Sequence, residues 1–341
     1  MSISKGTISI RLVNEALYEW QTAGHPVTAL LERAGIASEL LDKPFSRVTA
    51  KQYAQLWLAL AQEMDDEFFG MNPRRMKVGS FAFLARTAVK EPTLEGALRE
   101  IMRFLRLVMD DFKVETQISG GMLELSVATA GEPPRRAFTY FTLWMIVHGL
   151  MCWLVGRRIA IIAIDLQCAK PDYIEDYRVM FSDNLRFNQP RSRLLLNTDC
   201  LDFAIRRTPE ELSEFLHTSP QGILVRYRDS QSYAARIKAY LRGQKPDRWP
   251  DIEAVAAHFF ISPATLRRKL AHEGQSFQSL KDHVRRDLAI NRLNTGEQNY
   301  AELAYALGYA DSSAFYKAFK KWTGTTPGQY CAMVFGSNEH S

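Results

Sequence analysis

The chain has 341 residues, which suits two domains or one large domain with an appendage. Hydrophobic residues make up 46% of it and charged residues 24%, so it can bury a sizeable core, and the disordered and fibrous classes are excluded. Its four cysteines lie far apart, which argues against a disulfide framework, a zinc site or a redox motif. The N-terminal residues contain no basic segment followed by an apolar block, so we expect no signal peptide and a cytoplasmic location.

Most of the net charge of +5 lies in the last third of the chain. Residues 229–341 contain 15 Lys and Arg against 11 Asp and Glu, a balance of +4, and the rest of the chain contributes +1. A local basic excess favours an anionic partner such as nucleic acid, although many solvated helices are equally basic. The charge by itself leaves both interpretations open.

The first two thirds of the chain mix helices and strands. Thr49 and Gln52 form a capping box ahead of an amphipathic helix, and Thr93 is expected to cap a second one. Residues 112–129 alternate apolar and polar side chains around a pair of glycines, which predicts a β-hairpin. Short strand-like runs follow after residue 158. This part of the chain is therefore predicted to be one α+β domain.

Residues 137–156 form an uncharged, mostly apolar run that is long enough to cross a bilayer. Four features oppose a membrane span: the polar side chain of His148, the hydroxyl groups of Thr139, Tyr140 and Thr142, the isolation of the run, and the strand-like sequence IAIIAIDL that follows and continues the same core. We predict a buried core helix. A membrane-associated sensor that uses residues 137–156 remains the alternative.

From residue 229 onward the sequence predicts short helices only. Asp251 and Ser262 are expected to cap two of them, and a long polar helix is predicted over residues 277–293. Seven short helices are expected in all. The predicted organisation is an α+β effector-binding and dimerisation domain followed by an all-α domain, with these ranges: domain 1–222, linker 223–232, DNA-binding domain 233–335 and tail 336–341.

The first of two helix-turn-helix patterns begins at the Asp251 cap. Val255 and Ala256 of one helix precede a turn, and Leu266 and Leu270 of the next helix face inward at i, i+4 spacing. Arg side chains can reach guanine or phosphate from the opposite face of that helix. The outward residues predicted to contact DNA are Ala264, Thr265, Arg267 and Arg268.

The second pattern has the same organisation. Leu303, Ala304 and Leu307 form the supporting helix, and Gly308 opens the turn. The inward anchors of the following helix are Phe315, Phe319 and Trp322, and the outward residues predicted to contact DNA are Ser312, Ser313, Tyr316, Lys317 and Lys320. Helical hairpins of this kind also occur in structural bundles, so a ligand-binding protein whose helical tail is only structural is a second alternative.

The stretch A-x-A-L-G-Y-x-D-x-S-x-F-x-x-x-F-K-K-W-T-G-x-x-P, from Ala304 to Pro327, resembles the signature of the AraC/XylS family of bacterial transcription regulators. Residues 252–286 resemble the first helix-turn-helix of that family. The resemblance implies two recognition helices in one monomer, joined by the long helix 277–293 and entering successive major grooves on one face of DNA. It implies that Ala264, Arg267 and Arg268 read the first groove and that Ser312, Ser313 and Lys317 read the second. Ala264 is shorter than the side chains often found there, which limits it to contact with a thymine methyl group.

The N-terminal part resembles the effector domain of the branch related to the ornithine-utilisation regulator. The similarity is carried by residues 35–57, 77–88 and 175–202. It implies a domain that senses a small molecule and contributes to homodimer formation.

Trp144 and His148, on the apolar helix, are candidates for effector binding because a polar group among aromatic side chains orients a mostly apolar ligand. The alternative for His148, which we favour, is a core histidine bonded to a backbone carbonyl. The aromatic bias of this helix favours a hydrophobic effector. No GxGxxG, GxxxxGK[ST], GxSxG or HExxH motif occurs, so we expect no catalytic residues, no cofactor and no metal.

The sequence therefore predicts a cytoplasmic, bacterial, homodimeric transcription regulator of the AraC type that is not an enzyme. Its expected partners are double-stranded promoter DNA, a small-molecule effector and, if it acts as an activator, RNA polymerase. No membrane association is expected.

Overall fold

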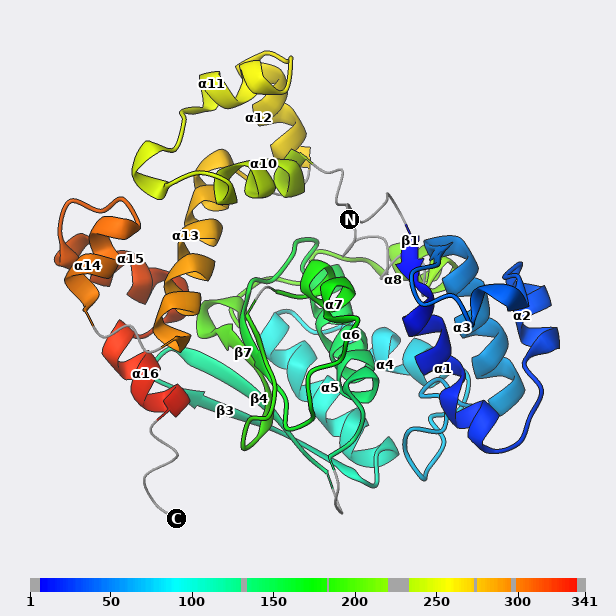
Figure 1. The fold of residues 1–341 in the computed structure, drawn as a ribbon. Coiled ribbons are helices and arrows are strands. Elements are labelled where there is room, and N and C mark those ends of the chain that lie inside the picture. The colour runs from blue at the N-terminus through cyan, green and yellow to red at the C-terminus, as the bar shows by residue number, and fades with distance from the viewer. Residues whose placement is uncertain are drawn as a thin grey trace. The chain divides into compact units, whose positions relative to one another are not determined.

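The computed structural model describes residues 7–129, 134–182, 184–219, 233–272, 275–295 and 299–335. They form two compact units, one built mainly on the chain before residue 220 and the other mainly on the chain after residue 232 (Figure 1). The predicted domain end at residue 222, the linker 223–232 and the tail 336–341 lie outside the described residues.

The first unit begins with a small group of helices beside a two-stranded antiparallel sheet. The Thr49 side chain accepts a hydrogen bond from the Gln52 amide, and the Gln52 side chain bonds back to Thr49, so the predicted capping box is confirmed. The elements are β1 (Thr7–Ser9), α1 (Ile10–Thr22), α2 (Thr28–Ala34), η1 (Ser38–Leu40), β2 (Arg47–Thr49) and α3 (Ala50–Met64).

A five-stranded sheet follows, in the order β3-β4-β7-β5-β6. Gly120 and Gly121 have φ angles of 56° and 86°, and they form the turn between β3 and β4, so the predicted hairpin is confirmed. β5 pairs in parallel with β6. The strands are β3 (Phe112–Ser119), β4 (Met122–Thr129), β5 (Ile161–Asp165), β6 (Leu185–Arg186) and β7 (Ser192–Asn197).

A buried ion-pair network joins four strands of this sheet. The Asp165 carboxylate on β5 accepts from Arg186 on β6, with Nε to Oδ1 at 2.5 Å, and from Arg193 on β7, with Nε to Oδ2 at 2.7 Å. Arg193 also bonds Glu124 on β4 at 2.9 Å. Each buried charge therefore has a partner, which burial requires.

Helix α6 (Ala137–Leu154) lies in the core of the first unit, packed against α1 and α5. Among the described residues it is the helix long and apolar enough to cross a membrane, and 94% of it is buried within the fold. The prediction of a core helix is thus confirmed. The remaining helices of this part of the chain are α4 (Ser80–Ala88), α5 (Leu94–Val108), α7 (Ile174–Met180), the short 3-10 helix η2 (Thr198–Cys200) and α8 (Pro209–Thr218).

The part of the second unit after residue 232 has helices as its only regular secondary structure among the described residues. Helix α13 lies between two groups of shorter helices, with α10 against one part of it and α15 and α16 against another. Ser276 caps α13 through a capping box. The elements are α10 (Tyr233–Arg242), η3 (Pro246–Arg248), α11 (Ile252–His258), α12 (Pro263–His272), α13 (Phe277–Asn294), α14 (Tyr300–Ala306), α15 (Ser312–Thr323) and α16 (Pro327–Phe335).

Candidate nucleic-acid interface

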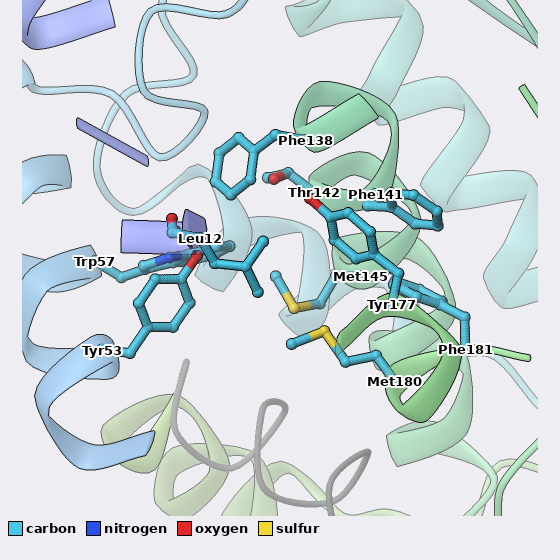
Figure 2. Close-up of a pocket in the computed structure, with 10 residues that line it drawn as sticks. All are labelled: Leu12, Tyr53, Trp57, Phe138, Phe141, Thr142, Met145, Tyr177, Met180 and Phe181. Carbon is cyan, nitrogen blue, oxygen red and sulfur yellow. Dashed lines mark hydrogen bonds between the residues drawn. The ribbon is translucent and has the colours of Figure 1, made fainter. Parts of the chain in front are cut away.

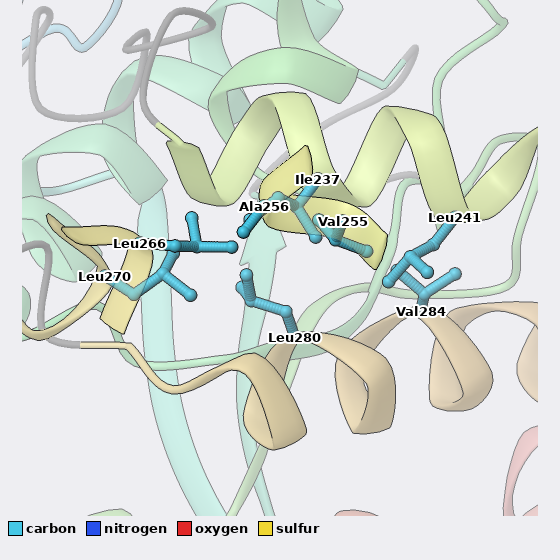
Figure 3. Packing of buried hydrophobic residues seen from close by; sticks show 8 residues of the cluster. All are labelled: Ile237, Leu241, Val255, Ala256, Leu266, Leu270, Leu280 and Val284. Atoms are coloured by element: carbon cyan, nitrogen blue, oxygen red, sulfur yellow. The ribbon is translucent and has the colours of Figure 1, made fainter. Parts of the chain in front are cut away.

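The first helix-turn-helix consists of α11 and α12, held by a compact apolar cluster. Leu266 and Leu270 of α12 are at most 1% exposed. They pack with Val255 of α11 and with Leu280 of α13, as Figure 3 shows. Because the inward side of α12 is fixed in this way, its opposite side is presented to solvent.

The predicted caps position both helices of this motif. Asp251 Oδ1 accepts from the Ala254 amide at 2.8 Å, and Ser262 Oγ accepts from the Thr265 amide at 3.2 Å. The Thr265 hydroxyl lies 2.9 Å from Ser262 Oγ and the residue is half-buried. Thr265 therefore takes part in the cap, and its hydroxyl is less available for DNA than those of fully exposed residues.

Ala264, Arg267 and Arg268 are exposed on the outward side of α12. The Arg267 guanidinium lies 3.2 Å from Glu253 Oε1 of α11, and both side chains are 59% exposed. An ion pair this exposed contributes at most about 1 kcal/mol, so a phosphate or a guanine can displace the carboxylate. Glu253 thus orients the Arg267 guanidinium and still leaves it able to bind DNA.

The second helix-turn-helix consists of α14 and α15. Phe315 and Phe319 are fully buried, and Asp311 Oδ1 accepts from the Ala314 amide at 2.7 Å to start α15. Leu303, Ala304 and Leu307 are buried as predicted. Trp322 is only half-buried, at 6.2 Å from the Tyr309 ring, so it lies at the edge of the core and not inside it.

The outward side of α15 combines hydroxyl groups and lysines. Ser313, Lys317 and Lys320 are exposed, whereas Ser312 and Tyr316 are half-buried. The Tyr316 ring packs edge to face on Tyr300 with centroids 5.9 Å apart, which leaves only part of it available to a partner.

Sequence reasoning missed three basic residues near these faces. Lys321 is exposed next to Lys320, a signal that simple adjacency could have supplied. Lys269 is exposed next to Arg268, but its Nζ lies 4.9 Å from the Tyr233 ring of α10. Arg285 of α13 plays a different part: its Nε donates to the Leu307 carbonyl at 3.0 Å, and its guanidinium lies 4.9 Å from the Trp249 ring. It fixes the end of α14 against the long helix.

The two effector candidates on α6 are both fully buried in the first unit. His148 Nε2 lies 2.9 Å from the Ile159 carbonyl oxygen, and burial lowers the pKa of His148 to about 4, so the ring is neutral near pH 7. This hydrogen bond confirms the interpretation of His148 as a core histidine. Trp144 is 0% exposed, and within the described residues its indole nitrogen has no hydrogen-bond partner.

Comparison with known proteins identifies both parts of the chain. The model of the arabinose-binding N-terminal domain of AraC transcription regulators matches residues 24–205, and that of a helix-turn-helix domain matches residues 255–333. The chain belongs to the AraC family of transcription regulators. It is thus a DNA-binding transcription regulator with an N-terminal effector-binding domain, and neither a membrane sensor nor a protein with a merely structural tail is supported.

Relatives of this AraC-family regulator are themselves regulators. The ornithine utilization regulator of Pseudomonas aeruginosa is 24% identical over 306 residues, which cover 89% of each chain. The urease operon transcriptional activator of Escherichia coli is 31% identical over 29% of this chain and 34% of its own. The crystal structure of the transcriptional regulator CdpR from Pseudomonas aeruginosa is similar with a TM-score of 0.32, at 20% identity, over 97% of this chain and 99% of that one.

Proposed function

We propose that one monomer reads two successive major grooves of promoter DNA, with α12 in the first and α15 in the second. The supporting observation is the geometry of α13, whose 18 residues span about 27 Å. Leu280 and Val284 near its start pack with α12, and α15 packs on the same helix. That span approaches one turn of B-DNA, about 34 Å, which separates successive grooves on one face.

We assign different tasks to the outward residues. Arg267 is the base reader of α12, Arg268 is shared between base and backbone, and Ala264 contacts a thymine methyl group. On α15, Ser313 and Lys317 face the groove and Lys320 contacts phosphate. Thr265, Ser312 and Tyr316 complete the two surfaces and orient their neighbours.

We assign effector binding and homodimer formation to the first unit. The protein acts in the cytoplasm, has no catalytic activity of its own and, if it is an activator, contacts RNA polymerase at the promoter. The family membership and the relatives' roles as regulators support this assignment.

The groove assignment is tested with full-length protein and an operator selected from a random DNA pool. Inserting five base pairs between the two half-sites moves the second site to the opposite face, so specific affinity should fall at least tenfold, toward the affinity for random DNA. Scrambling the inserted sequence at constant length is the control. Unchanged affinity after the insertion would show that only one helix reads DNA.

A further inference from the structure

The first unit also contains a pocket among its helices in which six of the ten lining residues are aromatic. Phe138 and Phe141 come from α6, Tyr53 and Trp57 from α3, and Tyr177 from α7 (Figure 2). Phe141 and Tyr177 stack with centroids 3.7 Å apart. The two rings are in contact and together form one aromatic wall, against which a flat, mainly apolar molecule can pack.

Two polar atoms on the pocket lining have no hydrogen-bond partner within the described residues: Trp57 Nε1 and Thr142 Oγ1. Trp57 is 7% exposed and Thr142 is 1% exposed. A buried threonine in a helix commonly bonds to the carbonyl one turn earlier, and an unsatisfied buried polar group is costly. A bound ligand can supply the partner that each of these groups lacks in the protein.

The composition of the pocket restricts the chemistry of that ligand. None of its ten lining residues carries a charge, so a charged amine or carboxylate would be buried without a counter-ion. The indole N–H of Trp57 can only donate, so the ligand must offer an acceptor.

Flexible side chains fill the centre of the pocket. The free space there is about 10 Å³, about enough for one water molecule. Figure 2 shows the thioether ends of Met145 and Met180 between Tyr53 and Tyr177. Methionine has three freely rotating bonds and repacks readily, so these two side chains can make room.

An open depression on the same unit lies beside this pocket. Its lining includes Glu15, which forms an ion pair with Arg136. Three segments contribute to both the pocket and the depression, through residues one to four positions apart: α1 with Leu12 and Glu15, α6 with Phe138 and Ala137, and α7 and its cap with Tyr177 and Tyr173.

We propose that this aromatic pocket is the effector site and that it takes a neutral aromatic molecule carrying a hydrogen-bond acceptor, bound by Trp57 and Thr142. The inference rests on the effector-binding role proposed above and specifies its location and ligand class. A free diamino acid, with its charged groups, is excluded from the pocket.

The test measures binding of acetophenone to the full-length protein by isothermal titration, with ethylbenzene as the matched probe that lacks the carbonyl. The wild-type protein should bind acetophenone about tenfold more tightly, the effect of one well-made hydrogen bond. Trp57→Phe and Thr142→Val should each reduce this preference to less than threefold. Thr139→Val, a buried threonine one turn away on α6 that does not line the pocket, should retain the full preference.

Thr142→Val removes an unpaired hydroxyl at nearly constant shape, so this variant should fold with an unchanged or higher thermal midpoint. No binding of either aromatic probe, an equal preference in all variants, or tighter binding of ornithine than of acetophenone would overturn the proposal. Operator titration of the same samples separates the two claims. If the protein loses affinity in the DNA spacing test as expected but does not bind acetophenone, only the pocket proposal is refuted. If it binds acetophenone but keeps its affinity in the spacing test, only the proposed reading of DNA is refuted.

Discussion

The two helix-turn-helix motifs contain the same kind of turn, in which one residue has a positive φ angle. The residue at this position differs between the two motifs. Phe260 has a φ of 56° in the first motif, and Gly308 has a φ of 79° in the second. In both turns the next residue donates its amide to an alanine carbonyl of the preceding helix at 3.0 Å. The hydrogen bonding is thus equivalent, although a bulky side chain is unfavourable at such an angle.

The surroundings of the two turns explain the difference. A Cβ atom at position 308 would lie 2.9 Å from the Pro246 carbonyl oxygen, a backbone atom that cannot easily move. The Phe260 side chain is 96% exposed and meets no such obstacle. Close packing around the second turn, and not the turn itself, makes glycine necessary there.

The outward faces differ as well. The first recognition helix presents Arg267 and Arg268, and the second presents Lys317 and Lys320 with neighbouring serines. Arginine recognises guanine through two parallel hydrogen bonds, whereas lysine acts more as a point charge toward phosphate. The first motif is therefore expected to contribute more of the sequence discrimination and the second more of the general affinity.

The largest expected effect is on the core of the second motif. Phe319→Ala should lower the free energy of unfolding by about 3 to 5 kcal/mol, because the ring is fully buried. Leu270→Ala, at the matching position of the first motif, should cost about 2 to 5 kcal/mol. Denaturant titration measures both. Wild-type stability together with lost DNA binding in Phe319→Ala would mean that the faces of α15 are assigned wrongly.

Gly308→Ala should destabilise the protein by about 1 to 3 kcal/mol, since the new methyl group combines an unfavourable φ with a backbone contact. Gly243→Ala is the control, because a Cβ there would make only ordinary contacts, the nearest at 3.5 Å. Equal thermal midpoints for the two variants would contradict the role assigned to Pro246.

Arg267→Ala should lose about 1 to 3 kcal/mol of discrimination at one base pair of the operator. Titration of the operator and a scrambled duplex at several salt concentrations measures this. Equal losses on both duplexes, with no relaxation at any single position, would make Arg267 a phosphate contact and remove the proposed contrast between the motifs.

Phe260→Gly should raise the free energy of unfolding by up to about 1 kcal/mol, because glycine relieves the left-handed strain and little burial is lost. The measurement is again denaturant titration. A clear loss of stability would indicate that the exposed ring has a packing role.

Lys320→Ala should have the smallest effect on discrimination. It should weaken binding to operator and scrambled duplexes alike and flatten the plot of log K against log salt by about one unit. Loss confined to the operator would place Lys320 at a base edge.

Local patterns in the sequence determined much of this protein. The caps at Thr49, Thr93, Asp251 and Ser262 form as predicted, because a cap depends on residues only three positions apart. The Gly120 hairpin and the inward leucines and phenylalanines follow from turn chemistry and helical spacing for the same reason.

Only the tertiary structure decided which residues that are far apart in the sequence come into contact. No periodicity relates Trp57 to Thr142 and Tyr177, so the aromatic pocket could not be predicted, and the sequence pointed to Trp144 and His148 instead. The hydrogen bond between His148 and Ile159 and the ion pair between Arg267 and Glu253 also depend on how separate elements pack. Helical spacing specifies which side of a helix is apolar, but only the packed fold decides whether that side closes a core or lines a pocket.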